Sequence, residues 1–128
     1  ESAKIDITKA ALYNELSEEF WYHSLDTSMM YALRTLKILK DKNDKKLEAE
    51  ATNNLGVAFW LKGEYPNAMR SLLASLKMYE VLKEKELQAM VSNNIGLVYH
   101  SQKKVLLSYM QEKLAALVAL LLSQQLML

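Results

Sequence analysis

A helical phrase that recurs about every 40 residues constrains the fold of this chain more than any other feature. Residues 53–60 read NNLGVAFW, and residues 93–100 read NNIGLVYH. Residues 11–21, ALYNELSEEFW, match the first phrase when the spacing is shortened by one residue. A period of this length is typical of arrays in which each repeat buries its apolar face against the next. The sequence therefore predicts three structurally equivalent units.

Each unit divides into two helical segments. In the middle unit, apolar residues recur at spacings of three and four on both sides of a break at Gly63 and Glu64. Pro66 suits the first turn of the second helix, because its missing N–H would have no partner there. We expect six helices, over about residues 8–23, 27–40, 46–62, 65–83, 87–102 and 105–123. They would form three hairpins, over about residues 8–40, 46–83 and 87–123, in a single domain that covers residues 1–128.

The composition agrees with an all-α fold. Of the 128 residues, 51% are hydrophobic, and only three are Gly and one is Pro, which favours helices over a β-sandwich or barrel. The net charge is +1, so no strong field would attract nucleic acid, and we expect no nucleic-acid partner. Cysteine is absent, which excludes disulfides and thiolate metal sites.

Two glycines stand at equivalent positions inside predicted helices. Gly56 and Gly96 each cost about 1 kcal/mol relative to alanine in a helix interior. A repeated cost at one position predicts that a neighbouring helix approaches closely there. Ser17 is the small residue at this position of the first unit, and Ala68 and Ser75 are candidates for the facing surface of the middle unit.

The middle unit resembles a tetratricopeptide (TPR) repeat. The residues that stand where this motif expects them are Leu55, Gly56, Phe59, Gly63, Tyr65, Ala68 and Leu72. In its repeat length of about 40 residues, the chain resembles the TPR arrays of bacterial signalling proteins.

The third unit follows the motif only in part. It keeps Ile95, Gly96 and Tyr99, but residues 103–105 read KKV where the motif has a Gly-x-Tyr turn. A slip of two residues restores the match at a spacing of 42, which pairs Met110, Leu114, Leu117 and Leu121 with Ala68, Leu72, Ser75 and Tyr79.

The TPR resemblance implies a right-handed superhelical array whose first helices line a groove for a peptide or a protein. The implied groove residues are Asn14, Glu18, Trp21, Asn53, Asn54, Val57, Trp60, Asn93, Asn94, Leu97 and His100. Asparagine can clamp a peptide backbone, because its amide both donates and accepts hydrogen bonds. Alternatively, the asparagines tie neighbouring hairpins together or face water, and the tryptophans are packing residues.

Residues with the spacing needed for catalysis are missing. His23 and His100 are the only histidines, and neither has a second histidine four residues away as a zinc site requires. There is no glycine-rich phosphate loop and no nucleophile elbow. We therefore expect no enzymatic activity, no cofactor and no metal.

The C-terminal segment is apolar on all sides. From residue 114 to residue 122 every residue is Leu, Ala or Val, whereas a terminal repeat helix should have a polar outer face. Either the array continues in a longer protein or the helix packs against a second copy. The residues expected at such a homodimer interface are Leu107, Leu114, Leu117, Val118 and Leu121. The uncharged stretch from residue 114 to residue 128 is shorter than the roughly 18–20 residues of a transmembrane helix, so we expect no membrane span.

These observations predict a non-catalytic protein- or peptide-binding module of a bacterial signalling or regulatory protein. Two alternatives stay open: a pheromone-peptide receptor domain, and a purely structural scaffold that self-associates. A cytoplasmic location is favoured, and a periplasmic one would follow if a signal peptide had been removed.

Overall fold

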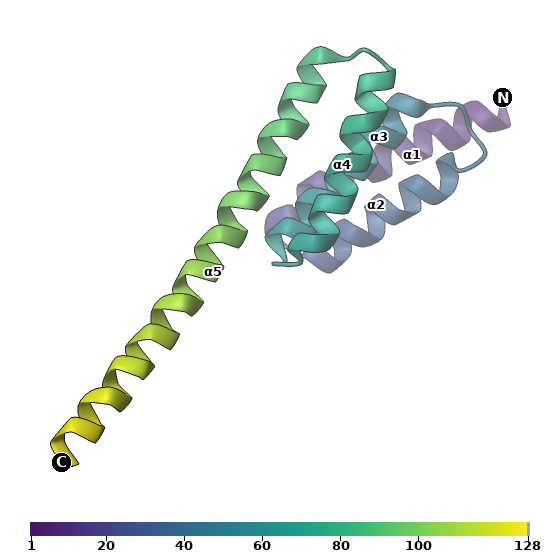
Figure 1. The fold of residues 1–128 in the computed structure, drawn as a ribbon. Coiled ribbons are helices and arrows are strands. Elements are labelled where there is room, and N and C mark those ends of the chain that lie inside the picture. Colours follow the sequence, from purple (N-terminus) through teal and green to yellow (C-terminus); the bar gives the residue numbers. More distant parts are fainter. Residues whose placement is uncertain (128) are drawn as a thin grey trace. The chain divides into compact units, whose positions relative to one another are not determined.

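The computed structural model describes residues 1–127 and is all-helical over that range (Figure 1). Its elements are α1 (Ser2–Glu19), the short 3-10 helix η1 (Phe20–Tyr22), α2 (Leu25–Leu39), α3 (Lys45–Leu61), α4 (Tyr65–Val81) and α5 (Lys85–Met127). The predicted all-α class is therefore confirmed.

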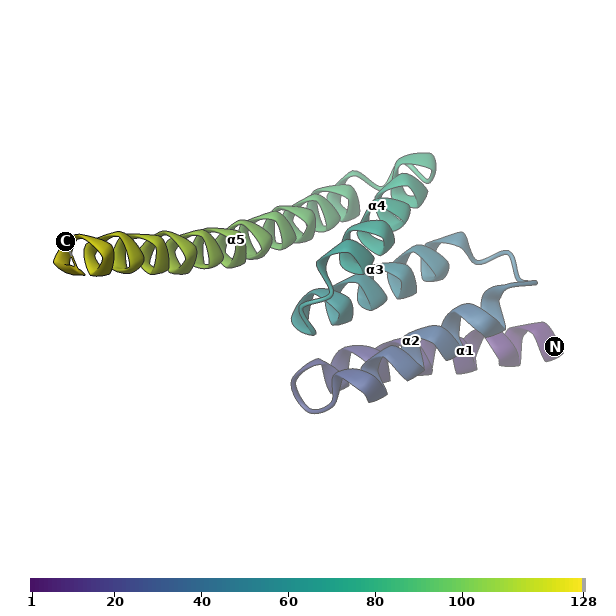
Figure 2. The same ribbon diagram turned by 60° about the horizontal axis from the view of Figure 1, so that its bottom comes forward.

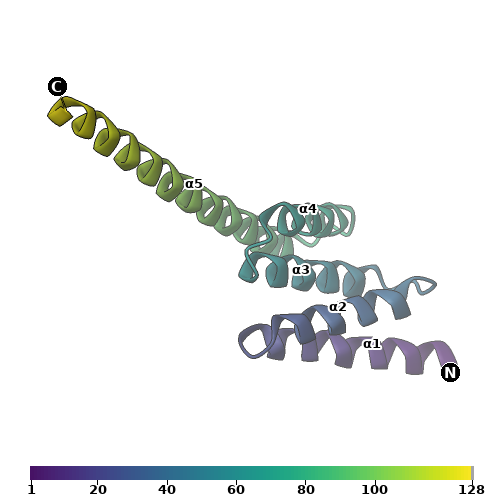
Figure 3. The same ribbon diagram turned by 90° about the horizontal axis from the view of Figure 1, so that it is seen from below.

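The chain divides into two compact units, of which the first covers residues 1–98 and the second begins at Tyr99. In the first unit, α1 pairs with α2 and α3 pairs with α4, and α2 also packs against α3. Figures 2 and 3 show these four helices side by side in chain order. The first part of α5, up to Val98, completes this unit, because Val91 and Val98 are buried in its core with Leu72 and Tyr79 of α4.

Local sequence signals set the ends of these helices. The Ser24 hydroxyl accepts a hydrogen bond from the backbone N–H of Thr27 at the start of α2, at 3.3 Å. The Asp44 carboxylate does the same for the N–H of Leu47 at the start of α3, at 3.0 Å. The turns after α3 and α4 contain residues in the left-handed region, Gly63 with φ of 81° and Lys83 with φ of 58°.

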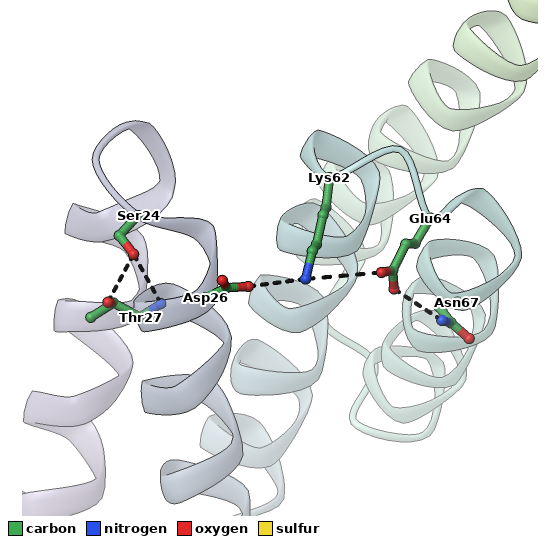
Figure 4. Close-up of polar contacts among 6 residues, drawn as sticks. All are labelled: Ser24, Asp26, Thr27, Lys62, Glu64 and Asn67. Atoms are coloured by element: carbon green, nitrogen blue, oxygen red, sulfur yellow. Dashed lines mark hydrogen bonds and ion pairs between the residues drawn. The ribbon is translucent and has the colours of Figure 1, made fainter.

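Ion pairs and hydrogen bonds at one end of the hairpins join neighbouring elements (Figure 4). The Lys62 ammonium, just after α3, lies 2.9 Å from a carboxylate oxygen of Asp26 in α2 and 4.0 Å from one of Glu64. The hydrogen bond from Lys62 to Asp26 raises the pKa of the Lys62 ammonium, and the charge of Asp26 adds to this effect. These groups are exposed, so the pair orients the two hairpins more than it stabilises them.

The close approach predicted at Gly56 is confirmed. A Cβ atom at Gly56 would lie only 2.8 Å from Cγ and Cδ2 of Leu72 on α4. The side chain that contacts Gly56 is therefore Leu72, although Ala68 and Ser75 are also fully buried on the same face of α4.

Hydroxyl groups repeat the same contact in both hairpins. Ser75 of α4 donates to the carbonyl oxygen of Ala49 at 2.7 Å, and Thr35 of α2 donates to that of Ala10 at 3.2 Å. Since Thr35 and Ser75 are 40 residues apart, the sequence period corresponds to a repeated helix-packing contact.

The third predicted hairpin is not present, because α5 continues from Lys85 to Met127 without a break. The prediction of a turn between residues 102 and 105 is therefore wrong. Residues 102–105 read QKKV and include neither Gly nor Pro, so nothing in this stretch disfavours a helix. At Gly96, no atom among the described residues lies within 4 Å of a Cβ built there, so a single chain does not supply the close approach expected at this position.

Helix α5 is long and apolar enough, by length and composition alone, to cross a membrane. Within Lys85–Leu126, an 18-residue window reaches a mean hydropathy of 1.6 with no more than two charged residues. The count of uncharged residues from position 114 missed this window, because the apolar pattern resumes on the N-terminal side of Glu112 and Lys113. The expectation of no membrane span stays a prediction.

Candidate functional site

Asn14 and Asn54 join the first helices of the two hairpins. The Asn54 amide nitrogen donates to the side-chain oxygen of Asn14 at 2.9 Å and to a carboxylate oxygen of Glu18 at 3.0 Å. Asn14 is 2% exposed and Asn54 is 1% exposed. The hydrogen bond between Asn54 and Asn14 therefore has a structural role, because a buried amide without hydrogen-bond partners would be strongly unfavourable.

A second asparagine pair continues this pattern. The Asn94 amide on α5 donates to the side-chain oxygen of Asn53 on α3 at 3.1 Å. Asn53 is buried and Asn94 is half-buried, whereas Asn93 is exposed. The alternative in which asparagines tie neighbouring repeats together thus accounts for both pairs. A direct role of any of these asparagines in ligand binding stays a prediction.

Negative charge gathers beside the Asn14–Asn54 pair. Glu50 on α3 is half-buried, and this burial together with the nearby charge of Glu18 raises the pKa of the Glu50 carboxyl. The charge of Lys46 and a hydrogen bond with Asn14 oppose the shift but do not cancel it. The region around Glu18 and Glu50 therefore carries negative charge that the protein compensates only in part.

Tyr79 borders the same region from α4. Burial, followed by the negative charges of Glu50, Glu84 and Glu18, raises the pKa of the Tyr79 phenol to about 12. The influence of Glu50 on Tyr79 links the carboxylates to the buried core of the first unit. Sequence analysis missed Glu50, although its position four residues before Asn54 places both on one face of α3.

The two tryptophans are partly buried. Trp21 lies in η1, and its indole nitrogen is buried without an acceptor among the described residues. Trp60 lies near the end of α3 and packs against the core cluster. The partial burial of both side chains agrees with packing roles, and contact with a ligand stays a prediction for each.

The remaining predicted groove residues have different environments. Val57 is 7% exposed and belongs to the core, whereas Leu97 is 39% exposed. Glu18 is exposed on α1. His100 belongs to the second unit, which begins at Tyr99. The structure therefore brings together Asn14, Glu18 and Asn54, and also Asn53 and Asn94, through hydrogen bonds, and a single groove formed by all the predicted residues stays a prediction.

The residues predicted for self-association all lie in the second unit and are exposed. They are Leu107, Leu114, Leu117, Val118 and Leu121, each between 47% and 62% exposed. Such a dense run of exposed leucines is unusual for a monomeric soluble protein, and self-association through them stays a prediction.

One further hollow lies between the start of α3 and the end of α4. It has a volume of about 440 Å³ and an apolar floor that includes Met78, Val81 and Leu82. Lys45 and Glu48, an ion pair at 2.9 Å, form its rim. The sequence did not predict this hollow. Among the described residues no group of three or more His, Asp or Glu side chains could hold a metal ion.

Comparison with known proteins gives no match to a family model, to a curated protein or to a solved structure.

Proposed function

We propose that this chain is a non-catalytic, TPR-like module that binds a protein or an extended peptide. Its binding surface would be formed by the first helices of successive repeats, α1 and α3, with the start of α5. As part of this proposal, the repeats stack against one another as TPR repeats do.

The observation that carries the proposal is the pair of asparagine bridges at the 40-residue period. The hydrogen bonds from Asn54 to Asn14 and from Asn94 to Asn53 join equivalent helices of consecutive repeats. Such bridges hold first helices in register, so that outward residues recur at regular intervals, as an extended ligand requires.

The charges favour a basic ligand. Glu18 is exposed, and burial, followed by the negative charge of Glu18, raises the pKa of the nearby Glu50 carboxyl. A lysine or arginine side chain of a ligand placed between these carboxylates would relieve the repulsion between them. It would also donate charge-assisted hydrogen bonds to their oxygens. Binding would then depend on salt and weaken as the Glu50 carboxyl becomes protonated.

The test is a binding measurement with immobilised random nonapeptides that carry Lys, Gln or Glu at a fixed central position. We expect the Lys set to bind best and Glu18→Gln to reduce that binding about tenfold, the effect of about 1.4 kcal/mol. Glu15→Gln, on the same helix and also exposed, is the matched control. Equal binding of the three peptide sets, or an unchanged affinity of Glu18→Gln, would reject the basic-ligand proposal.

Asn54→Ala is a poor test of ligand binding. Asn54 is buried and holds Asn14 and Glu18, so its loss would change the fold as well as the surface. Variants of the exposed Glu18 separate the two effects more cleanly.

A second candidate function is self-association as a scaffold. The exposed leucines of the second unit favour it, because the free energy falls when a partner removes a dense apolar surface from water. The two functions are compatible, since the proposed ligand surface and these leucines belong to different units.

A further inference from the structure

Within the first unit, one face of α5 lacks the cover that its counterpart on α3 has. On α3, Ala49, Thr52 and Gly56 are buried on one face, and α4 contacts this face through Ser75 at Ala49 and Leu72 at Gly56. The residues of α5 that are 40 positions later are Ala89, Ser92 and Gly96, and all three are exposed. We call these three the receiving face.

The receiving face is shaped for a helix. Gly56 is needed on α3 because Leu72 of α4 approaches so closely that a Cβ would lie 2.8 Å away. Gly96 repeats this residue in a helix interior but has no atom within 4 Å of a built Cβ. A glycine that lowers helix stability without contacting anything has no role in the isolated chain.

The second unit contains the segment whose pattern matches the missing cover. Met110, Leu114 and Leu117 follow Ala68, Leu72 and Ser75 of α4 at a spacing of 42. With Leu121, they recur at intervals of three and four along a helix, which places them on one face. We call these four residues the docking face. Leu114, Leu117 and Leu121 are 62%, 52% and 54% exposed.

In the chain as described, α5 is helical through residues 102–105, so this segment contains no chain reversal like the one that joins α3 to α4. A second copy supplies the same antiparallel pairing without a reversal. By the register of α3 and α4, Leu114 of one copy would lie opposite Gly96 of the other, and Leu117 opposite Ala89. Both contacts form twice when the twofold axis passes near Lys104.

Resting on the self-association candidate above, we propose that two copies of this chain form an antiparallel dimer through α5, in which the docking face of each covers the receiving face of the other. This is an exchanged form of the third repeat hairpin. The contact is isologous and closed, so assembly stops at two copies. It also matches large side chains on one segment with Ala, Ser and Gly on the other, as close helix packing requires.

The first experiment is size-exclusion chromatography with light scattering over a concentration series. We expect a dimer in the unmodified chain, and Gly96→Gln should raise its dissociation constant at least tenfold. Gly96→Gln leaves the isolated chain unharmed, because nothing contacts this position. Met90→Gln is the matched control, since Met90 is 41% exposed on another face of the same helical segment. A monomer at all concentrations, an assembly larger than a dimer, or equal effects of the two variants would overturn the proposal.

The second experiment locates the contact by disulfide formation, which is clean because the chain has no cysteine. Ala89→Cys and a size-tagged Leu117→Cys are mixed and oxidised mildly. We expect a covalent heterodimer from this mixture and none when Met90→Cys replaces Ala89→Cys. The opposite preference would overturn the register. In a separate variant that carries both Ala89→Cys and Leu117→Cys, an intramolecular disulfide would overturn it as well. Recovery on phosphatidylcholine vesicles without cross-linking would assign the docking face to a membrane and also overturn the proposal.

These results are separable from those on ligand binding. The peptide assay uses Glu18 of the first unit and can be run at a concentration where the chain is monomeric. Loss of peptide binding with an intact dimer would reject only the binding proposal, and the reverse result would reject only the exchange.

Discussion

Gly56 and Leu72 lie so close that a Cβ atom on the glycine would be 2.8 Å from two carbons of the leucine side chain. This contact sets how tightly α3 and α4 pack. The equivalent glycine on α5, Gly96, has free space around it, so the same residue in the same repeat position experiences two opposite environments.

The two glycines should therefore respond oppositely to alanine. Gly56→Ala forces α4 away from α3 and should lower the free energy of unfolding by about 1–3 kcal/mol. Gly96→Ala should raise that of the monomer by up to about 1 kcal/mol, because alanine is the better helix former. Urea denaturation at a concentration that keeps the chain monomeric measures both. Destabilisation by Gly96→Ala of the same size as for Gly56→Ala would mean that Gly96 is covered within a single chain.

The buried asparagine bridge predicts a loss of stability when Asn54 is changed. Asn54→Ala leaves the side-chain oxygens of Asn14 and Glu18 without this donor, and should lower the free energy of unfolding by about 1–3 kcal/mol. Asn93→Ala is the control, because Asn93 is exposed and surface changes rarely exceed about 0.5 kcal/mol. A double-mutant cycle with Asn14→Ala should give a coupling energy, and additivity of the two changes would indicate that the bridge contributes nothing.

Stability should depend on pH through Glu50. Its pKa in the folded chain is raised above the ordinary value of 4.5, mainly by burial and next by Glu18. The folded chain thus binds this proton more tightly than the unfolded chain does. The resulting stability is fully present below pH 4.5 and is lost as pH rises through the folded pKa.

Glu50→Gln removes this titration. The variant should melt at a higher temperature than the unmodified chain at pH 7 and at nearly the same temperature at pH 3.5, because the protonated carboxyl resembles the amide. Thermal melts at several pH values check this, with Glu15→Gln as an exposed control on α1. A constant difference between Glu50→Gln and the unmodified chain at all pH values would rule out Glu50 as the origin.

The sequence predicted the helices well where the period is regular and failed where a turn depends on a few residues. Spacing of apolar residues located α2, α3 and α4 to within a few positions, because periodicity directly reflects burial. The turn after residue 102 was inferred from repetition alone, although no Gly or Pro occurs there. Repetition alone therefore predicted a turn at a place where the local residues favour a continuous helix.

The candidate site was predictable only in part. Repetition singled out Asn14, Asn53 and Asn54, but it could not tell whether these amides face a ligand or one another. Glu50 escaped notice because it does not recur: the residue 40 positions later is Met90. Features that depend on a single repeat require the three-dimensional arrangement.

The division of the chain into two units predicts that the first folds without the second. A chain that ends after Ser101 keeps both hairpins and the part of α5 that carries Val91 and Val98, and hence the described core. Compared with the full chain at a concentration where that chain is monomeric, its melting temperature should change by less than about 5 °C, a shift that corresponds to about 1 kcal/mol in a domain of this size. It should also be monomeric, because it lacks the docking face.

Circular dichroism melts and light scattering on this shortened chain measure both properties. As a control, a full-length chain with Leu114→Gln and Leu121→Gln keeps the length of α5 but loses the apolar docking face. Both variants should be monomers with cooperative melting transitions. If the shortened chain lost its cooperative transition while the full-length control kept it, residues after Ser101 would have to support the core of the first unit, and the two units would not be independent.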